Sequence, residues 1–305
     1  MVRSRCKPAG KRLPVEIPLD GVGYQIELVR NVNLPPTAPR LVVVSHVQNS
    51  IARDLLRVCL AAIRRFTPEP HELWVVDNNS PMENLNGLLL MDDANLVLNR
   101  TEPLPPEGRQ PEAGEPLVVS QRNWGSYANA VGLELAARLI DPRSCYFMSL
   151  HMDALPCREG WLSFLQSKLS DGIAAAGVRM DKTRTPEGVL HVLGYMVDFR
   201  LFKSLELSFF PDLPRLDVGD DVTIKLREAG YGVFACSNTV WEPELAEKLS
   251  ASSPLRDLHV DRSFDDCGNV IFLHLGRGLR RSSGEHRKGI TAEEWIGFVD
   301  ESLLS

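Results

Sequence analysis

Short apolar segments alternate with amphipathic segments through the first half of this sequence. The run LVVVS at residues 41–45 is continuously apolar, as in strands that are buried on both faces of a parallel sheet. Residues 51–66 have helical periodicity, with Asn49 or Ser50 as the N-cap. Further strands are predicted at 71–77, 94–99 and 145–150, with a helix from about Ser126. This alternation predicts an α/β fold with a mainly parallel central sheet flanked by helices.

The remaining segments are less regular. One strand is predicted before the alternation, at residues 24–29, and residues 101–116 form a surface loop rich in proline and glutamate. The second half predicts strands at 173–178, 232–236 and 269–275, a long antiparallel strand at 189–199, and helices at 160–169, 222–231 and 291–304.

Composition excludes several classes of protein. With 34 basic and 40 acidic residues the net charge is -6, so a nucleic-acid partner is not expected. The sequence has no apolar run of transmembrane length. The six cysteines are scattered, with no CxxC pair, which indicates a reduced protein without structural zinc. We expect a cytoplasmic protein, with peripheral contact to a membrane still open.

Chemically active side chains follow the predicted strands. In parallel sheets, ligands bind at the carboxyl ends of the strands, so these positions form the candidate site. The sequence has no lysine-containing phosphate loop and no GxGxxG motif, so a divalent cation, Mg²⁺ or Mn²⁺, is the expected partner of a phosphate group. The candidates are Ser45, His46, Asp77, Asn78, Asn79, Ser80, His151, Asp153, Asp217, Asp220, Asp221 and His274.

The order of the motifs resembles that of GT-A fold glycosyltransferases of the family-2 type. The pieces are VVVSH, LWVVDNNSP, NWGSYANA, YFMSLHMDALPCREGW and DVGDDVTIKLREAGY, and the resemblance covers roughly residues 41–236. No single piece is specific, but five pieces in this order are. The resemblance implies transfer of a sugar from a nucleotide-diphosphate sugar to an acceptor hydroxyl, with inversion and with a metal ion.

The resemblance also assigns the donor site. The end of the first strand and the acidic residue after the second would hold the nucleotide, which implies Ser45, with His46 beside it, and Asp77, with Asn79 nearby. The segment NWGSYANA would pack beneath the nucleotide, with Asn123 and Gly125 at its edge. Apart from the resemblance, the arginines of the late basic loop, Arg277, Arg280 and Arg281, form either a solvated surface loop or a lid over the diphosphate.

Metal ligands and a base are implied in the same way. The Asp-x-Asp metal motif falls on HMD, so Asp153 is the expected ligand, and His151 replaces the first aspartate. A late histidine, His274, would complete the Mn²⁺ or Mg²⁺ site. The acidic loop matches the general base, with Asp220 preferred over Asp217 and Asp221 because an Asp-Asp pair opens a helix.

The expected organisation is a single packed unit. Residues 1–40 form an N-terminal extension with one strand. Residues 41–250 form the catalytic domain, with its nucleotide-binding part at about 41–155 and its acceptor part at about 156–250. Residues 251–305 form a C-terminal segment with a basic loop and a final helix on the same domain.

Each assignment has a simpler structural alternative. Asp77 and its neighbours favour turns, Asp220 and Asp221 are good helix caps, and His151 or His274 could be a satisfied buried histidine. At the level of function, His151 favours a catalytically inactive relative that only binds the nucleotide-sugar. A sugar-phosphate nucleotidyltransferase ranks lower, because no glycine-rich loop follows residues 41–45.

Overall fold

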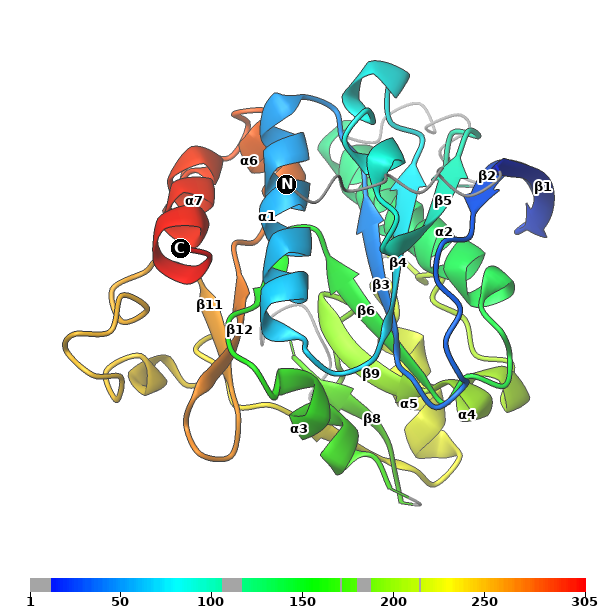
Figure 1. Cartoon of the computed structure of the whole chain (residues 1–305). Helices are drawn as coiled ribbons and strands as arrows, with labels where there is room; N and C mark the ends of the chain where they lie inside the picture. The colour runs from blue at the N-terminus through cyan, green and yellow to red at the C-terminus, as the bar shows by residue number, and fades with distance from the viewer. Residues whose placement is uncertain (1–11, 106–116, 171, 180–187, 214) are drawn as a thin grey trace, which may run out of the picture.

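A nine-stranded sheet forms the centre of the protein (Figure 1). The structure is a computed structural model that describes residues 12–105, 117–170, 172–179, 188–213 and 215–305, with 117–123 described by backbone alone. All strands of this sheet run in the same direction except β2 and β9. In spatial order the strands are β1 (Arg12–Leu19), β2 (Val22–Val29), β5 (Ala94–Asn99), β4 (Glu72–Asn78), β3 (Arg40–Ser45), β6 (Tyr146–His151), β9 (Gly194–Asp198), β8 (Ile173–Gly177) and β10 (Gly232–Ala235).

Helices cover both faces of the sheet, which makes three layers and confirms the predicted α/β class. Val43 and Val75 point to the face covered by α1 (Ser50–Phe66), whereas Val42 and Trp74 point to the face covered by α2 (Leu117–Leu139). The side chains of these central strands are therefore buried on both faces, which explains their continuous apolar runs. The other helices are α3 (Trp161–Lys168), α4 (Phe199–Ser204), α5 (Asp220–Glu228), α6 (Gly278–Ser282) and α7 (Ala292–Phe298), with short 3₁₀ or π turns at Met82–Asn84, Leu88–Leu90, Pro243–Leu245 and Val299–Leu303.

A small second sheet lies beside the main one. It contains β11 (Asp261–Phe264), β12 (Val270–His274) and β7 (Ala154–Pro156), which pair antiparallel in that order. Phe272 of this sheet and Trp295 of α7 belong to the same buried apolar cluster as α1, and α7 lies next to α1 (Figure 1). The C-terminal segment therefore shares the core of the main sheet.

The N-terminal segment differs from the prediction of a single strand. It forms a hairpin in which β1 pairs with β2 over their whole length, and Asp20 and Gly21 make the turn with positive φ. Pro14 and Pro18 made β1 hard to recognise, because proline cannot donate to a ladder. Proline is tolerated here because β1 is the edge strand of the sheet.

Other predicted elements hold, with shifted boundaries. Asn49 caps α1 by accepting a hydrogen bond from the Ala52 N–H, and Thr291 and Glu294 form a capping box at α7. The helix expected from Ser126 begins earlier, at Leu117, and the long strand expected at 189–199 is limited to β9, which pairs antiparallel as predicted. The strands β7 and β11 and helix α4 were not predicted, and α6 lies where a basic loop was expected. Most of the loop expected at 101–116 lies outside the described residues.

Two further expectations concern membranes and cysteines. No helix among the described residues is both long enough and apolar enough to cross a membrane. The described cysteines are all free, and Cys59 is buried as expected, whereas Cys145 is only half-buried. Cys6 lies outside the described residues.

Candidate functional site

Strand register brings several of the polar residues to one edge of the main sheet. Ser45 at the end of β3 is the register partner of Asp77 on β4, and Val44 is the partner of His151 at the end of β6. These strands are parallel neighbours, so their carboxyl ends meet at the same edge. The site therefore starts from β3, β4 and β6 at the centre of the sheet.

The second sheet adds a histidine from far along the chain. After β6 the chain turns through Met152 and Asp153 and enters β7, whose Ala154 is the register partner of His274 at the end of β12. The Leu275 N–H also donates to the Asp153 carbonyl at 3.0 Å. This pairing lays His274 beside Asp153, although 120 positions in the sequence separate them.

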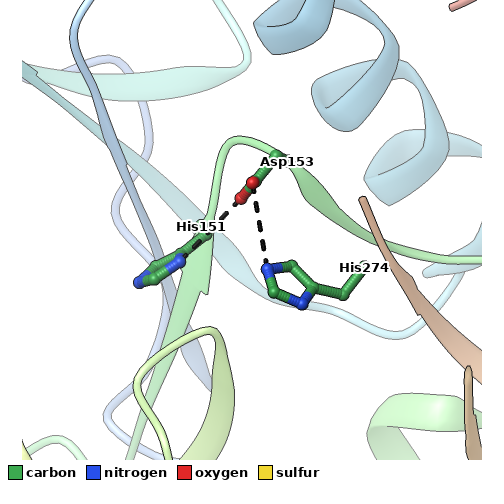
Figure 2. Close-up of side chains that lie close together, drawn as sticks. All are labelled: His151, Asp153 and His274. Carbon is green, nitrogen blue, oxygen red and sulfur yellow. Dashed lines mark ion pairs between the residues drawn. The ribbon is translucent and has the colours of Figure 1, made fainter. Parts of the chain in front are cut away.

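His151, Asp153 and His274 form one cluster, shown in Figure 2. Nδ1 of His151 lies 3.9 Å from Oδ1 of Asp153, and Nε2 of His274 lies 3.8 Å from Oδ2 of the same carboxylate. One possible ligand atom from each residue can be chosen so that all lie within 4.8 Å of one another. The two imidazoles thus approach a single carboxylate from different strands.

Each member of the cluster has a second contact that orients it. Nδ1 of His274 lies 3.1 Å from Oδ2 of Asp261 on β11. Nε2 of His151 lies 2.8 Å from the amide nitrogen of Asn129 on α2. The Gly278 N–H donates to Oδ2 of Asp153 at 2.8 Å. Side chains held in this way have little freedom to turn away from one another.

The electrostatic environment of the two imidazoles differs. Burial lowers the pKa of His151, and this effect outweighs the attraction of Asp153 and Asp217 for a protonated ring. Burial also opposes protonation of His274, but the carboxylates of Asp153 and Asp261 outweigh it and raise the pKa of that ring. His151 is therefore held as a neutral imidazole, which is the form that binds metal ions.

The three aspartates of the acidic loop have different surroundings. Asp217 is half-buried, and it is close enough to His151 to attract a proton to that ring. Asp220 has 0% exposure, and its Oδ2 accepts a hydrogen bond from the Asp217 N–H at 2.9 Å. Asp221 is paired with Lys225 one turn along α5, at 2.6 Å. Asp217 thus interacts electrostatically with His151 of the His151–Asp153–His274 cluster.

Asp77 and Ser45 lie at the expected edge, but both side chains are buried. Asp77 has 0% exposure, and its carboxylate accepts hydrogen bonds from the Ser80 hydroxyl and backbone N–H and pairs with Arg100 at 3.6 Å. Burial raises the pKa of Asp77, against the hydrogen bonds from Ser80. The Ser45 hydroxyl donates to the Val76 carbonyl at 3.4 Å. Both side chains therefore stabilise the backbone where β3 and β4 end, and they have almost no exposed surface for a ligand.

The other candidates for nucleotide binding are more exposed. His46 and Asn79 are half-buried, with Nδ1 of His46 at 3.1 Å from the Asn78 carbonyl and Asn79 at a φ of 61°. Gly125 is exposed on α2. Arg277 is exposed at a φ of 59°, immediately before Gly278, which contacts Asp153. The Asn123 side chain lies outside the described part of the structure.

Sequence reasoning missed two residues that contact the cluster, Asn129 and Asp261. Asn129 belongs to the segment NWGSYANA and directly precedes an apolar stretch of the helix. A polar side chain at such a position needs a hydrogen-bond partner, and this need was the available signal. Asp261 lies opposite His274 in the hairpin β11–β12 because the register shifts by one residue between Ser263 and Phe264, and this irregularity has no clear sequence signal. The hairpin itself was not recognised, so this register was not available.

The donor set of the cluster fits a divalent cation. A carboxylate with two imidazoles suits Mn²⁺ better than Mg²⁺, which prefers oxygen ligands. Because Nδ1 of His274 faces Asp261, its Nε2 is the atom left for an ion. If Nδ1 of His151 binds the ion, Nε2 carries the proton and needs an acceptor. The Asn129 amide can provide its oxygen as this acceptor by rotating through 180°, which exchanges its nitrogen and oxygen, two atoms of similar size.

Comparisons with known proteins find distant likenesses among solved structures and no match by sequence. No family model matches this sequence, and no curated protein matches it either. Among solved structures, a mannosyltransferase from Pyrobaculum calidifontis in complex with GDP-mannose and Mn²⁺ is 18% identical, with a TM-score of 0.43, over 67% of this chain and 56% of its own. The galactosyltransferase LgtC, in complex with donor and acceptor sugar analogues, is 14% identical, with a TM-score of 0.49, over 87% and 96%. Mouse xyloside xylosyltransferase 1 is 12% identical, with a TM-score of 0.37, over 56% and 69%.

This chain thus spans little more than half the length of the Pyrobaculum calidifontis mannosyltransferase. Likenesses of this extent do not fix a function. The function of this protein must therefore be argued from the residues at the edge of its own sheet.

Proposed function

We propose that this protein is a glycosyltransferase of GT-A fold that transfers a sugar from a nucleotide-diphosphate sugar to an acceptor hydroxyl, with inversion at the anomeric carbon. The observation that carries the proposal is the convergence of His151, Asp153 and His274 at the carboxyl edge of the sheet. The ordered motifs between residues 41 and 236 support the same reading. Either kind of support alone would be weaker, because acidic and imidazole groups also meet in structural clusters.

The cluster is the proposed site of a Mn²⁺ or Mg²⁺ ion. When bound there, the cation supplies positive charge to the diphosphate leaving group. Asp153, His151 and His274 hold it, and the Gly278 N–H orients the Asp153 carboxylate through its Oδ2. Gly278 opens α6 and directly follows Arg277, so the Arg277 guanidinium is carried one residue away from the backbone contact to Asp153.

Asp217 is the proposed general base. It accepts the proton of the acceptor hydroxyl as that oxygen attacks the anomeric carbon, and the diphosphate departs on the other side of the sugar. The half-buried position of Asp217 near His151 supports this role. Asp220 is fully buried and accepts a hydrogen bond from the Asp217 N–H, so we propose that it holds the loop and does not act as the base.

The nucleotide is proposed to lie across the ends of β3 and β4. The partly exposed side chains of His46 and Asn79 are the contacts best placed for it. Asp77 and Ser45 would not contact the nucleotide directly. Asp77 would stabilise the turn after β4 through its hydrogen bonds from Ser80. Gly125 and Asn123 on α2 would border the same site, as the resemblance implies.

Donor turnover tests the proposal directly. The purified protein is incubated with a panel of nucleotide-diphosphate sugars, with and without Mn²⁺, and thermal stability and release of free nucleotide diphosphate are recorded. A true donor should raise the melting temperature through binding to the native state. Nucleotide release should need Mn²⁺ and should be lost in Asp153→Asn. A panel that gives neither stabilisation nor release contradicts the proposal.

One alternative is supported by a specific observation. His151 stands where the family has an aspartate, and Oδ2 of Asp153 already accepts a hydrogen bond from Gly278. Both features favour a relative that binds the nucleotide-sugar without turning it over. In that case the same panel would give stabilisation by a donor with no release of nucleotide at any Mn²⁺ concentration.

A further inference from the structure

Asp261 stands behind His274, on the side away from Asp153. The two residues are register partners on the antiparallel strands β11 and β12, and Oδ2 of Asp261 lies 3.1 Å from Nδ1 of His274. An ionised carboxylate can only accept a hydrogen bond, so Nδ1 carries the proton. The neutral ring then has its lone pair on Nε2, which is the atom 3.8 Å from Asp153.

Charge gives this contact a second consequence. With His151 in the place of an aspartate, Asp153 provides the only negative charge within the His151–Asp153–His274 cluster. Asp261 adds a second carboxylate through the ring of His274. A carboxylate that accepts the distal N–H of a ligating histidine fixes the tautomer and makes the other nitrogen a stronger donor.

We propose that Asp261 is a positioning residue of the metal site, which fixes His274 with its proton on Nδ1, directs Nε2 toward the ion and supplies the negative charge that His151 lacks. The inference rests on the metal site in the proposed function. Asp261 itself does not touch the ion or the sugar. Its effect is confined to the orientation and basicity of His274.

The competing explanation is a structural pair between two strands. The Asp261 side chain is 45% exposed and lines a small pocket together with His274, Arg179 and Asn238. A pair that is open to solvent on one side contributes little to stability. Removal of Asp261 should therefore leave the chain folded, which makes its effect on the ion measurable.

The experiment measures Mn²⁺ alone binding to the full-length protein, by electron paramagnetic resonance of the free ion, without any sugar donor. Asp261→Ala should weaken Mn²⁺ binding by about 10–100-fold. Asp261→Asn should weaken it less, because the amide oxygen still accepts the Nδ1 proton. Asp257→Asn is the matched control, since it removes the same charge from an exposed position four residues earlier, and it should bind like the parent.

A second readout reports the tautomer. At a pH high enough to keep the His274 ring neutral, long-range ¹H–¹⁵N spectra of histidine-labelled protein should show its proton on Nδ1 in the parent, with the signal assigned by its loss in His274→Gln. In Asp261→Ala the proton should be shared between Nδ1 and Nε2. A purely structural pair would lower thermal stability without this change.

The outcomes separate the two proposals. If the parent binds Mn²⁺ and Asp261→Ala binds it equally well, or if Asp257→Asn weakens it as much, the role of Asp261 is overturned while the metal site stands. If the parent does not bind Mn²⁺, the metal site of the proposed function is overturned, and the inference about Asp261 is overturned with it.

Discussion

Asp217, Asp220 and Asp221 lie within five positions of the chain, yet their side chains meet different surroundings. Asp217 acts electrostatically on His151, Asp220 is closed off from solvent, and Asp221 pairs with Lys225. A base must be able to reach the hydroxyl of an acceptor, so exposure toward the cluster matters more than position at a helix start. The N-cap of α5 is Gly219, which makes no side-chain cap hydrogen bond, so none of the three aspartates is the cap of this helix.

The corresponding amides test the assignment of the base. Asp217→Asn should lower kcat by roughly 10²–10⁴-fold, because an amide cannot accept the proton, and should leave donor affinity unchanged. Asp221→Asn is the control and should keep nearly full activity. Asp220→Asn should lower thermal stability more than either neighbour, because the buried contact to the Asp217 N–H is weakened. Equal activity in Asp217→Asn and the parent would remove Asp217 from the mechanism.

Sequence reasoning reached the residues of β3, β4 and β6 more easily than their partners. Ser45, Asp77, His151 and Asp153 follow or end long apolar strands, and the rule for parallel sheets puts such residues at one edge. The exposure of Asp77 was not predictable, because it depends on Ser80 and Arg100 folding back onto its carboxylate. Side-chain direction after a strand is decided by such local contacts.

At the scale of elements, the packing of α2 on β3 sets how closely the helix approaches the site. A Cβ on Gly132 of α2 would lie 2.5 Å from Cγ1 of Val44, so the Val44 side chain packs directly against the helix backbone at Gly132. Val44 is the register partner of His151, and α2 also carries Asn129, which contacts His151. The tight contact therefore holds both residues that flank this imidazole.

Gly132→Ala should destabilise the protein despite the better helix propensity of alanine. The propensity gain is about 1 kcal/mol, whereas overpacking a close contact costs roughly 1–3 kcal/mol. Urea unfolding should therefore give a lower free energy of unfolding. Adding Val44→Ala removes the side-chain atoms that clash with the new Cβ. The double variant should therefore be less destabilised than the sum of the two single variants.

Gly297→Ala in α7 is the control for this experiment. A Cβ there would meet nothing within 4 Å, so the substitution should be neutral or stabilising. A stabilised Gly132→Ala would mean that the helix moves away from β3 at no cost.

Short elements mark the limit of prediction at this scale. The strands β7 and β11 have 3 and 4 residues, too few for a period of two to stand out from chance. Their pairing with β12 stabilises them: β7 reaches β12 from more than a hundred residues away, and β11 pairs with it through a hairpin whose register shifts near the turn. The long strands β3–β6 and the helix α1 carry their own pattern and were predicted correctly as elements.

At the scale of the whole molecule, a carboxyl group buried away from the site affects the free energy of folding. Glu134 of α2 is 5% exposed, and its Oε1 accepts hydrogen bonds from the Phe209 N–H at 2.6 Å and the Ser208 hydroxyl at 2.9 Å. These contacts tie α2 to the segment that precedes the acidic loop. Burial raises the pKa of Glu134, against the effect of both hydrogen bonds.

Glu134 should make the folding of the whole chain depend on pH. Below its ordinary pKa of 4.5 the group is protonated in both the folded and the unfolded state, so burial carries no charge penalty. As the pH rises from there through the raised folded pKa, the unfolded state loses its proton first, and the stability due to this group is lost.

Glu134→Gln keeps an oxygen for both hydrogen bonds and has no proton to lose. The variant should therefore gain stability relative to the parent as the pH rises from 5 to 8, as measured by urea unfolding at each pH. Glu247→Gln at an exposed position should show a difference from the parent that does not change over this range, and the same flat result for Glu134→Gln would mean that Glu134 is ionised in the fold at little cost.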